Sequence, residues 1–315
     1  MASTDPEDQA RLELLGELGR RGYRFITPTP ETHRRVVSRP ANQQARDLAD
    51  IFGWSLPFAP DLLDPPLFAL MNSAGLVAPR GNLLISTHRV SSLGDMLFLH
   101  SAWPTAEANA VFFGPDTYRF ARFLRQELGG CRKPIQRLVD IGCGSGAGAL
   151  LAARLTGAPD VVMADINPAA LRLASVNARA ASVPASVVQS DVMQDLDGEF
   201  DLIVSNPPYL VDEAARTYRH GGAMKGAALS LRIARDAAAR LADGGLLLLY
   251  TASAIEGGCD SFRDAVVPML HDAGCQATYE EIDPDVWGEE LERAPYDAVD
   301  RIAVVSVKAV KEARQ

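Results

Sequence analysis

Residues 135–148 read Ile-Gln-Arg-Leu-Val-Asp-Ile-Gly-Cys-Gly-Ser-Gly-Ala-Gly. The apolar residues of Ile135–Ile141 predict a buried strand, and the alanine- and leucine-rich stretch after the glycines predicts a helix that continues to Leu155. Glycines at such a strand-to-helix turn let a ligand approach the backbone N–H groups closely. The stretch therefore predicts an α/β fold with a nucleotide-like ligand at the carboxyl end of this strand.

The same alternation of strand and helix continues along the rest of the chain. Apolar runs predict further strands at Val161–Ile166, Ser186–Gln189, Leu202–Val204, Leu246–Tyr250, Thr278–Ile282 and Ile302–Val307. Helices are expected at Pro168–Ala181 and Ala227–Leu241. Continuous apolar strands that alternate with helices are typical of a doubly wound, Rossmann-like parallel sheet. We expect a seven-stranded domain of this class over residues 111–315.

Residues 1–110 have a different pattern and are expected to form a smaller N-terminal domain. The sequence predicts three helices and a hairpin of two short strands, at Pro6–Gly19, Ala41–Phe52, Asp64–Ala74, and Asn82–Ser86 with Asp95–His100. This order resembles a winged-helix module. Such a module can recognise a substrate or cap the neighbouring domain, and both roles stay open for residues 1–110.

The segment Arg20–Arg39 is strongly basic, with six arginines and His33 against one acid, Glu31. Two interpretations remain: a solvated linker, or a contact strip for an anionic partner such as RNA. The isolated histidines His88 and His100 are expected to be structural.

Composition limits the classes of protein to consider. The chain has 315 residues, 47% of them hydrophobic, and a net charge of −9, which argues weakly against a broad nucleic-acid-binding surface. No apolar stretch is long enough to cross a bilayer, and the first residues are polar and acidic, unlike a signal peptide. The four cysteines show neither paired nor metal-ligand spacing; they are Cys131, Cys143, Cys259 and Cys275. We therefore expect a cytoplasmic protein with no membrane partner and no metal.

Acidic residues lie at the ends of three successive predicted strands. Asp165 comes 23 residues after Gly142, where it can accept hydrogen bonds from two ribose hydroxyls. Asp140 precedes the glycines, where a carboxylate can face a cationic group, and Asp191 is placed to meet an adenine amino group. The glycine pattern also fits a dinucleotide fingerprint. Acids after three successive strands favour S-adenosylmethionine over a dinucleotide.

A second motif ends the segment Phe200–Leu210, which reads Phe-Asp-Leu-Ile-Val-Ser-Asn-Pro-Pro-Tyr-Leu. The two prolines stiffen the backbone, so the Asn206 amide oxygen and the Pro207 carbonyl oxygen form two fixed hydrogen-bond acceptors. Two such acceptors can hold both N–H bonds of a planar –NH2 group and aim its lone pair at an electrophile. The Tyr209 ring can lie against the acceptor's face. We predict that Asn206, Pro207, Pro208 and Tyr209 form the catalytic segment.

Together these segments resemble class I methyltransferases, in particular the HemK/PrmC-type glutamine N5-methyltransferases that modify peptide release factors. The matching segments are Asp140-Ile-Gly-Cys-Gly-Ser-Gly146, Asp165-Ile-Asn-Pro168, Ser190-Asp191 and Asn206-Pro-Pro-Tyr209. Weaker matches are Val111–Thr117, Tyr218–Gly222 and Lys225–Leu229. The resemblance covers about residues 111–310, whereas residues 1–110 do not resemble that family's helical recognition bundle.

The resemblance implies S-adenosyl-L-methionine as the cofactor and N-methyl transfer as the reaction. It implies a cofactor site comprising Asp140, Gly142, Cys143, Gly144, Ser145, Gly146, Asp165, Ile166, Asp191, Val192 and Asn206. Val192 stands where the family often has an aromatic residue. The acceptor implied by the resemblance is a protein glutamine side chain.

Other acceptors and one other class of enzyme stay open. An adenine N6 or guanine N2 of ribosomal or transfer RNA, or a small metabolite, also presents a planar nitrogen. An NAD(P)-dependent oxidoreductase would account for the glycine loop, but it would leave the Asn206–Tyr209 motif without a role.

Overall fold

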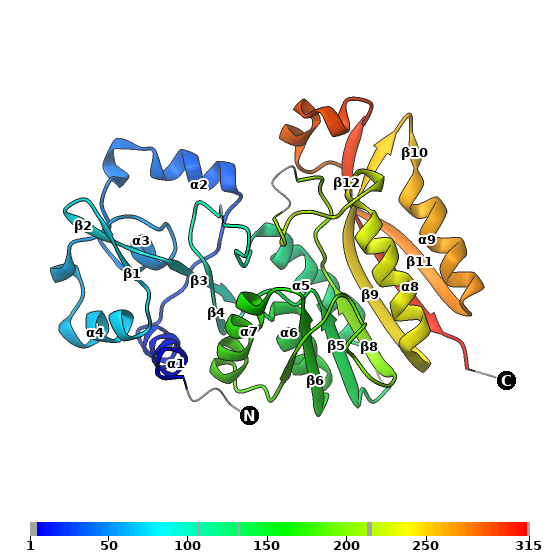
Figure 1. Cartoon of the computed structure of the whole chain (residues 1–315), viewed down its shortest axis with the longest axis horizontal. Coiled ribbons are helices and arrows are strands. Elements are labelled where there is room, and N and C mark those ends of the chain that lie inside the picture. The colour runs from blue at the N-terminus through cyan, green and yellow to red at the C-terminus, as the bar shows by residue number, and fades with distance from the viewer. Residues whose placement is uncertain (1–4, 106, 131–132, 213–215, 314–315) are drawn as a thin grey trace.

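The computed structural model describes residues 5–105, 107–130, 133–212 and 216–313. Its centre is a twisted sheet of eight strands with helices on both faces, and the N-terminal region lies beside it along the long axis (Figure 1). The predicted α/β class, with a smaller N-terminal region that contains helices, is confirmed; the short β10 adds an eighth strand to the seven expected.

The strand order of the large sheet is β11-β12-β9-β8-β5-β6-β7, with the short β10 paired to β9. The strands are β5 (Arg137–Ile141), β6 (Asp160–Asp165), β7 (Ser186–Gln189), β8 (Phe200–Ser205), β9 (Leu241–Glu256), β10 (Cys259–Asp260), β11 (Cys275–Asp283) and β12 (Arg301–Lys311). The pairs among β5 to β9 are parallel. β12, however, is antiparallel to both β9 and β11. The expected parallel sheet is therefore confirmed for β5 to β9 and was wrong for β12, because apolar runs show that a strand is buried but not in which direction it runs.

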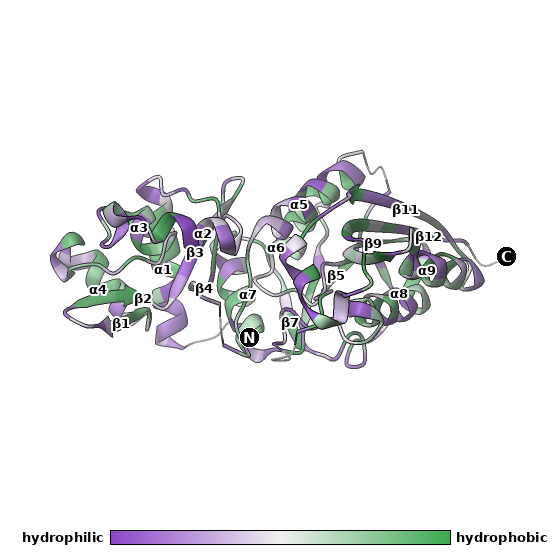
Figure 2. Cartoon of the chain, turned by 90° about the horizontal axis from the view of Figure 1, so that it is seen from above, coloured by the Kyte–Doolittle hydropathy of each residue, from purple (hydrophilic) through white to green (hydrophobic). Residues whose placement is uncertain are grey.

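The helices of this part cover the two faces of the sheet. They are α5 (Pro115–Leu128), α6 (Ala147–Thr156), α7 (Pro168–Ala180), α8 (Ala228–Arg240) and α9 (Ser261–Asp272). One core lies between the sheet and α5, α6 and α7, and a second lies between the sheet and α8 and α9. Alternate residues of each inner strand enter the two cores; on β5, for example, Leu138 enters the first and Val139 the second. The hydropathy colouring shows the helices hydrophobic toward the sheet and hydrophilic away from it (Figure 2).

The N-terminal region contains α1 (Pro6–Arg20), α2 (Pro30–Val37), α3 (Leu48–Phe52) and α4 (Pro65–Ser73). Two antiparallel hairpins follow, β1 (Val77–Arg80) with β2 (Leu83–Ser86), and β3 (His88–Leu93) with β4 (Met96–Ser101). The helices expected at Pro6–Gly19 and Asp64–Ala74 are confirmed, and the acid before α4, Asp64, caps that helix.

Two predictions for this region were wrong. The helix expected at Ala41–Phe52 is confined to α3 and a single 3-10 turn at Pro40–Asn42. The two apolar runs expected to pair with each other instead form separate hairpins, because each finds a closer partner across a tight turn. The sequence pattern located the two apolar runs correctly, but it did not show which strand each of them pairs with.

The segment Arg20–Arg39 is not an extended linker, because it contains α2, which Thr29 caps. Several of its arginines have acidic partners: Arg20 and Arg21 bond Glu17, Arg21 also bonds Asp64, and Arg34 and Arg35 bond Glu31. His33 is buried, hydrogen-bonded through Nε2 to the Trp54 carbonyl, and stacked on Trp103. His100 is also buried, next to Ser91.

The N-terminal region shares cores with the sheet-containing region. A third core joins α1, α3, α4 and the β3–β4 hairpin to one side of α7, through Ala170, Leu173 and Val176. Residues on the other side of the same hairpin, Phe98 among them, enter the core under α5. A domain boundary near residue 110 stays a prediction.

Candidate active site

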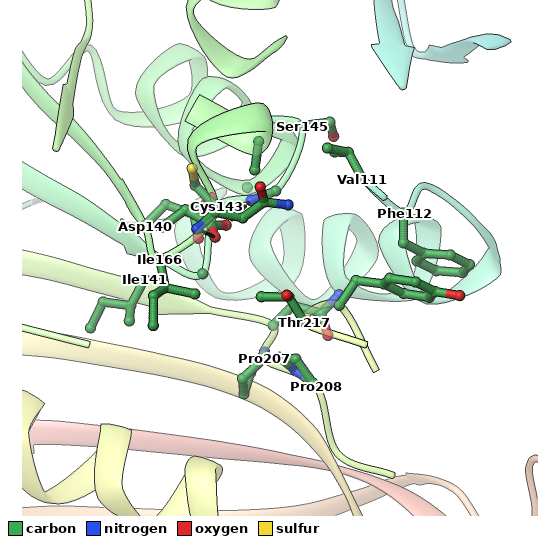
Figure 3. Close-up of a pocket in the computed structure, with 18 of the residues that line it drawn as sticks. Val111, Phe112, Asp140, Ile141, Cys143, Ser145, Ile166, Pro207, Pro208 and Thr217 are labelled. Carbon is green, nitrogen blue, oxygen red and sulfur yellow. Dashed lines mark hydrogen bonds between the residues drawn. The ribbon is translucent and has the colours of Figure 1, made fainter. Parts of the chain in front are cut away.

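A cavity of about 410 Å³ lies at the carboxyl ends of β5, β6 and β8 (Figure 3). This volume is in the range that binds small molecules and cofactors. Nearly all of the predicted cofactor residues line the cavity: Asp140, Gly142, Cys143, Gly144, Ser145, Asp165, Ile166, Asp191, Val192 and Asn206. Gly146 does not line it. That residue packs on Ala174 and Met163 instead, where a Cβ would be tightly placed.

The glycine loop forms one wall of the cavity. Gly142 and Gly144 have φ angles of 68° and 53°, a conformation that other residues adopt only with strain. A Cβ at either position would meet no neighbouring atom within 4 Å, so the space beside the loop is open. The loop thus leaves its backbone accessible from the cavity, and contact of these glycines with a cofactor stays a prediction.

Asp165 ends β6 and is held by backbone donors. Its Oδ2 accepts a hydrogen bond from Gly144 N at 2.9 Å, and its Oδ1 accepts one from Asn167 N at 2.9 Å. Burial raises the pKa of this carboxyl, while the backbone N–H groups oppose that shift. Each oxygen keeps a further lone pair, so the carboxylate can still accept hydrogen bonds from a diol.

Asp140 lies at the bottom of the cavity and is only 1% exposed. Its Oδ2 accepts a hydrogen bond from Ala149 N at 2.8 Å, which ties it to the first turn of α6. Burial is the main cause that raises the pKa of Asp140 to about 7. Gly148 is required beside it, because a Cβ there would lie 2.6 Å from the same carboxylate oxygen. A buried carboxyl that titrates near neutrality is suited to contact a cationic ligand group.

Asp191 lines the cavity but is already paired. Arg232 of α8 donates to both of its oxygens, with Nη1 at 2.9 Å and Nη2 at 3.0 Å. Beside it, Val192 has a φ of 58°, which is strained for a branched residue. Ile166 exposes 52% of its surface at the cavity, so an apolar face is available to a ligand there. Contact of Asp191 with an adenine amino group stays a prediction.

The Asn-Pro-Pro segment separates this cavity from a smaller one of about 70 Å³. Asn206, Pro207 and Pro208 line both. Ser205 anchors the segment by donating to the Ile141 carbonyl at 2.7 Å. The Asn206 side chain has no hydrogen-bond partner among the described residues. Its amide is therefore free to bind a ligand at the junction of the two cavities.

Tyr209 does not line the larger cavity. Its ring is largely buried and lines only the smaller one, together with Phe112, Tyr218 and Trp287. The Tyr209 hydroxyl donates to Asp116 Oδ2 at 2.6 Å. The hydroxyl is thus bound to the protein, and the ring is the part of Tyr209 that can meet an acceptor.

Sequence reasoning missed several residues of the site. Phe112 and Asp116 lie in the Val111–Thr117 segment, and Tyr218 begins Tyr218–Gly222, so the family resemblance marked their segments but assigned them no role. The rings of Phe112 and Tyr218 are nearly parallel, with centroids 5.9 Å apart, and both line the smaller cavity with the Asn-Pro-Pro segment. No sequence motif marked Arg232 or Trp287 as a residue of the site, because only the tertiary fold brings these two side chains to it.

No group of side chains suited to hold a metal occurs in the part of the chain that the structure describes. Within the same part, no helix has the length and apolar character needed to span a membrane.

The sheet-containing region is similar to known methyltransferases. Residues 119–257 match the family model described as "Methyltransferase small domain". A release factor glutamine methyltransferase of Deinococcus radiodurans is 34% identical over 198 residues, which cover 59% of this chain and 66% of that protein. A ribosomal RNA small subunit methyltransferase C of Serratia proteamaculans is 34% identical over 73 residues, 23% of this chain and 21% of that protein.

The fold is also similar to that of wild-type Trm5b from Pyrococcus abyssi. The TM-score is 0.50 at 15% identity, and the match covers 75% of this chain and 62% of that one. The matches to the Deinococcus and Serratia methyltransferases span about two thirds or less of the length of those proteins.

Proposed function

We propose that this chain, whose residues 119–257 match the methyltransferase small domain model, is an S-adenosylmethionine-dependent N-methyltransferase that acts on a protein glutamine side chain. The observation that carries the proposal is the free amide of Asn206, which lies at the junction of the two cavities. The similarity to release factor glutamine methyltransferases supports the glutamine acceptor.

The residues of the larger cavity fit S-adenosylmethionine. The Asp165 carboxylate can accept from the ribose hydroxyls, the exposed Ile166 side chain offers a face for the adenine, and the buried Asp140 can meet the cationic methionine end. The open backbone at Gly142 and Gly144 leaves room for close contact. When bound, this cofactor supplies an electrophilic methyl group.

The protein's part in the reaction is to hold the acceptor nitrogen. The Asn206 side-chain oxygen and the Pro207 carbonyl oxygen accept its two N–H bonds, and the fixed backbone of the two prolines keeps these acceptors in place. A conjugated nitrogen is a poor nucleophile, and this alignment directs its lone pair toward the methyl group. The rings of Phe112, Tyr209, Tyr218 and Trp287 line the smaller cavity beside these two acceptors.

The main competing acceptor is an RNA base, because ribosomal RNA methyltransferase C shares part of the domain. The basic segment Arg20–Arg39 gives this alternative less support than its sequence suggested. Arg20, Arg21, Arg34 and Arg35 are each paired with a nearby acid.

The test is transfer of a radiolabelled methyl group from S-adenosylmethionine into fractionated cell extract, in parallel with Asn206→Ala. We expect label in the protein fraction, as N5-methylglutamine after digestion, and its loss with the variant. Label in the RNA fraction or in small molecules would contradict the glutamine acceptor and identify RNA or a metabolite as the methyl acceptor. Calorimetry with S-adenosylhomocysteine and with NAD checks the cofactor, and binding of NAD alone would contradict the proposal.

A further inference from the structure

Asp116 lies in the first turn of α5 and is 4% exposed. Its Oδ2 accepts from the Tyr209 hydroxyl at 2.6 Å, and its Oδ1 accepts from the Tyr250 hydroxyl at 3.1 Å. Arg119 approaches the same Oδ1 at 3.3 Å. A buried carboxylate is costly without such partners, and a position in the first turn of a helix favours its negative charge. The carboxylate thus joins α5 to the end of the Asn-Pro-Pro-Tyr motif, 93 residues further along the chain.

The Tyr209 hydroxyl uses both of its hydrogen-bonding capacities within the protein. It donates to Asp116 and accepts from Trp287 Nε1 at 3.2 Å. The hydrogen bonds to Asp116 and from Trp287 fix the hydroxyl end of the Tyr209 ring.

The near end of Tyr209 is fixed by the backbone. Gly226 approaches so closely that a Cβ there would lie 2.1 Å from the Tyr209 carbonyl oxygen. Gly221 donates from its N to the Leu210 carbonyl at 2.7 Å. The backbone at Tyr209 is therefore held on one side and the hydroxyl on the other, and the ring between them lines the smaller cavity with Asn206.

We propose that Asp116 is a positioning residue for methyl transfer, which acts through the Tyr209 hydroxyl to hold the ring against the face of the acceptor amide. The inference rests on the proposed function. Asn206 and Pro207 determine where the nitrogen lies, whereas the ring held by Asp116 determines the plane of the amide. In other proteins, some buried charged groups serve to fix one geometry and do not add stability.

The test compares Tyr209→Phe, Asp116→Ala and the double variant. The readouts are kcat, the KM for the acceptor, the affinity for S-adenosylhomocysteine and the midpoint of thermal unfolding. Tyr279→Phe is the matched control, because its hydroxyl also donates to a carboxylate, Asp260 Oδ2, at 2.6 Å but lies outside the site. Asp116→Asn keeps one acceptor oxygen and serves as the conservative variant if Asp116→Ala fails to fold.

We expect Tyr209→Phe and Asp116→Ala each to lower kcat about tenfold, the effect of one lost orienting hydrogen bond. S-adenosylhomocysteine affinity should stay within about twofold of wild type. The double variant should be no slower than the slower single variant, because the two residues act through one bond. Asp116→Asn should recover part of the loss.

Three results would overturn the role of Asp116. They are losses that multiply in the double variant, a Tyr209→Phe kcat equal to that of Tyr279→Phe, and a loss of S-adenosylhomocysteine affinity that parallels the loss of kcat. A wild-type protein that methylates no acceptor overturns the proposed function, whereas an active wild type with unaffected variants overturns only the role of Asp116.

Discussion

The two halves of the site are built in different ways. The cofactor half is formed by strand ends and the turns after them, in which Asp140 to Gly144 and Asp165 to Asn167 bond mostly to backbone groups nearby. The acceptor half brings together side chains from three distant segments: Phe112 and Asp116 from the first, Tyr209 from the second and Trp287 from the third. A half made by local backbone geometry leaves a signature in the sequence, and a half made by long-range side-chain contacts leaves little.

The two halves should therefore separate in experiment: changes in the acceptor half should affect turnover, and changes in the cofactor half should affect affinity.

The largest effect is expected for Asn206→Ala. The variant removes the free amide at the junction of the cavities, so kcat should fall by about 10²–10³, the scale of other lost transition-state hydrogen bonds. Affinity for S-adenosylhomocysteine, measured by calorimetry, should remain. Near-normal turnover together with intact affinity would mean that the motif is only a turn.

The converse change is Asp165→Ala in the cofactor half. Each charge-assisted contact to a ribose hydroxyl that is lost should weaken S-adenosylhomocysteine binding by about 1.5–3 kcal/mol. At saturating cofactor, kcat should change much less than in Asn206→Ala. Unchanged affinity in calorimetry would show that Asp165 only anchors the Gly144 and Asn167 backbone.

A smaller effect should follow from the titration of Asp140. Because burial raises the pKa of Asp140 to about 7, the carboxyl is neutral below that pH and charged above it. A cationic ligand group favours the charged form, so S-adenosylmethionine affinity should fall several-fold from pH 8 to pH 6. Asp140→Asn should abolish that dependence. An equal pH dependence in the variant would assign it to another group.

The same titration affects stability with the opposite sign. The unfolded carboxyl has a pKa near 3.9, so between about pH 4 and pH 7 the folded protein without cofactor retains a proton that the unfolded chain releases. The contribution of Asp140 to stability is greatest at the acid end of this window and is lost as the pH rises to about 7. Asp140→Asn should remove this component from the pH dependence of thermal unfolding.

The smallest effect is expected outside both halves, at Arg172. This α7 side chain bonds Asp5, Glu7 and Asp8 of the N-terminal region. Partly exposed ion pairs contribute little, so Arg172→Met should lower the free energy of unfolding by about 1 kcal/mol in urea titrations. Cofactor affinity and kcat should not change. A large loss of either would show that the N-terminal region orients the cofactor half.

The same difference between local and long-range contacts explains which predictions held. Ser186–Gln189 was predicted with its observed bounds, and Pro168–Ala181 to within one residue, because each depends on local residue pattern and capping. The direction of β12 was missed, because β12 pairs with β9, a strand far from it in the chain. The pairing of Leu83–Ser86 was missed for another reason: its partner Val77–Arg80, just across a tight turn, was not recognised as a strand. The N-terminal helix at Ala41–Phe52 was overestimated because apolar spacing alone does not show where a helix starts; Asp47, the N-cap of α3, marks that point.

By itself, the amino-acid sequence determined the strand-turn-helix units, the glycine loop, the acids after the strands and the stiff Asn206–Tyr209 turn. These follow from backbone sterics and hydrogen bonding over a few residues. Only the tertiary structure decided that Arg232 would pair with Asp191, and that Asp116 and Trp287 would hold the Tyr209 hydroxyl. Such contacts join residues far apart in the chain, and they form only when the packing of whole helices and strands fixes where each side chain ends.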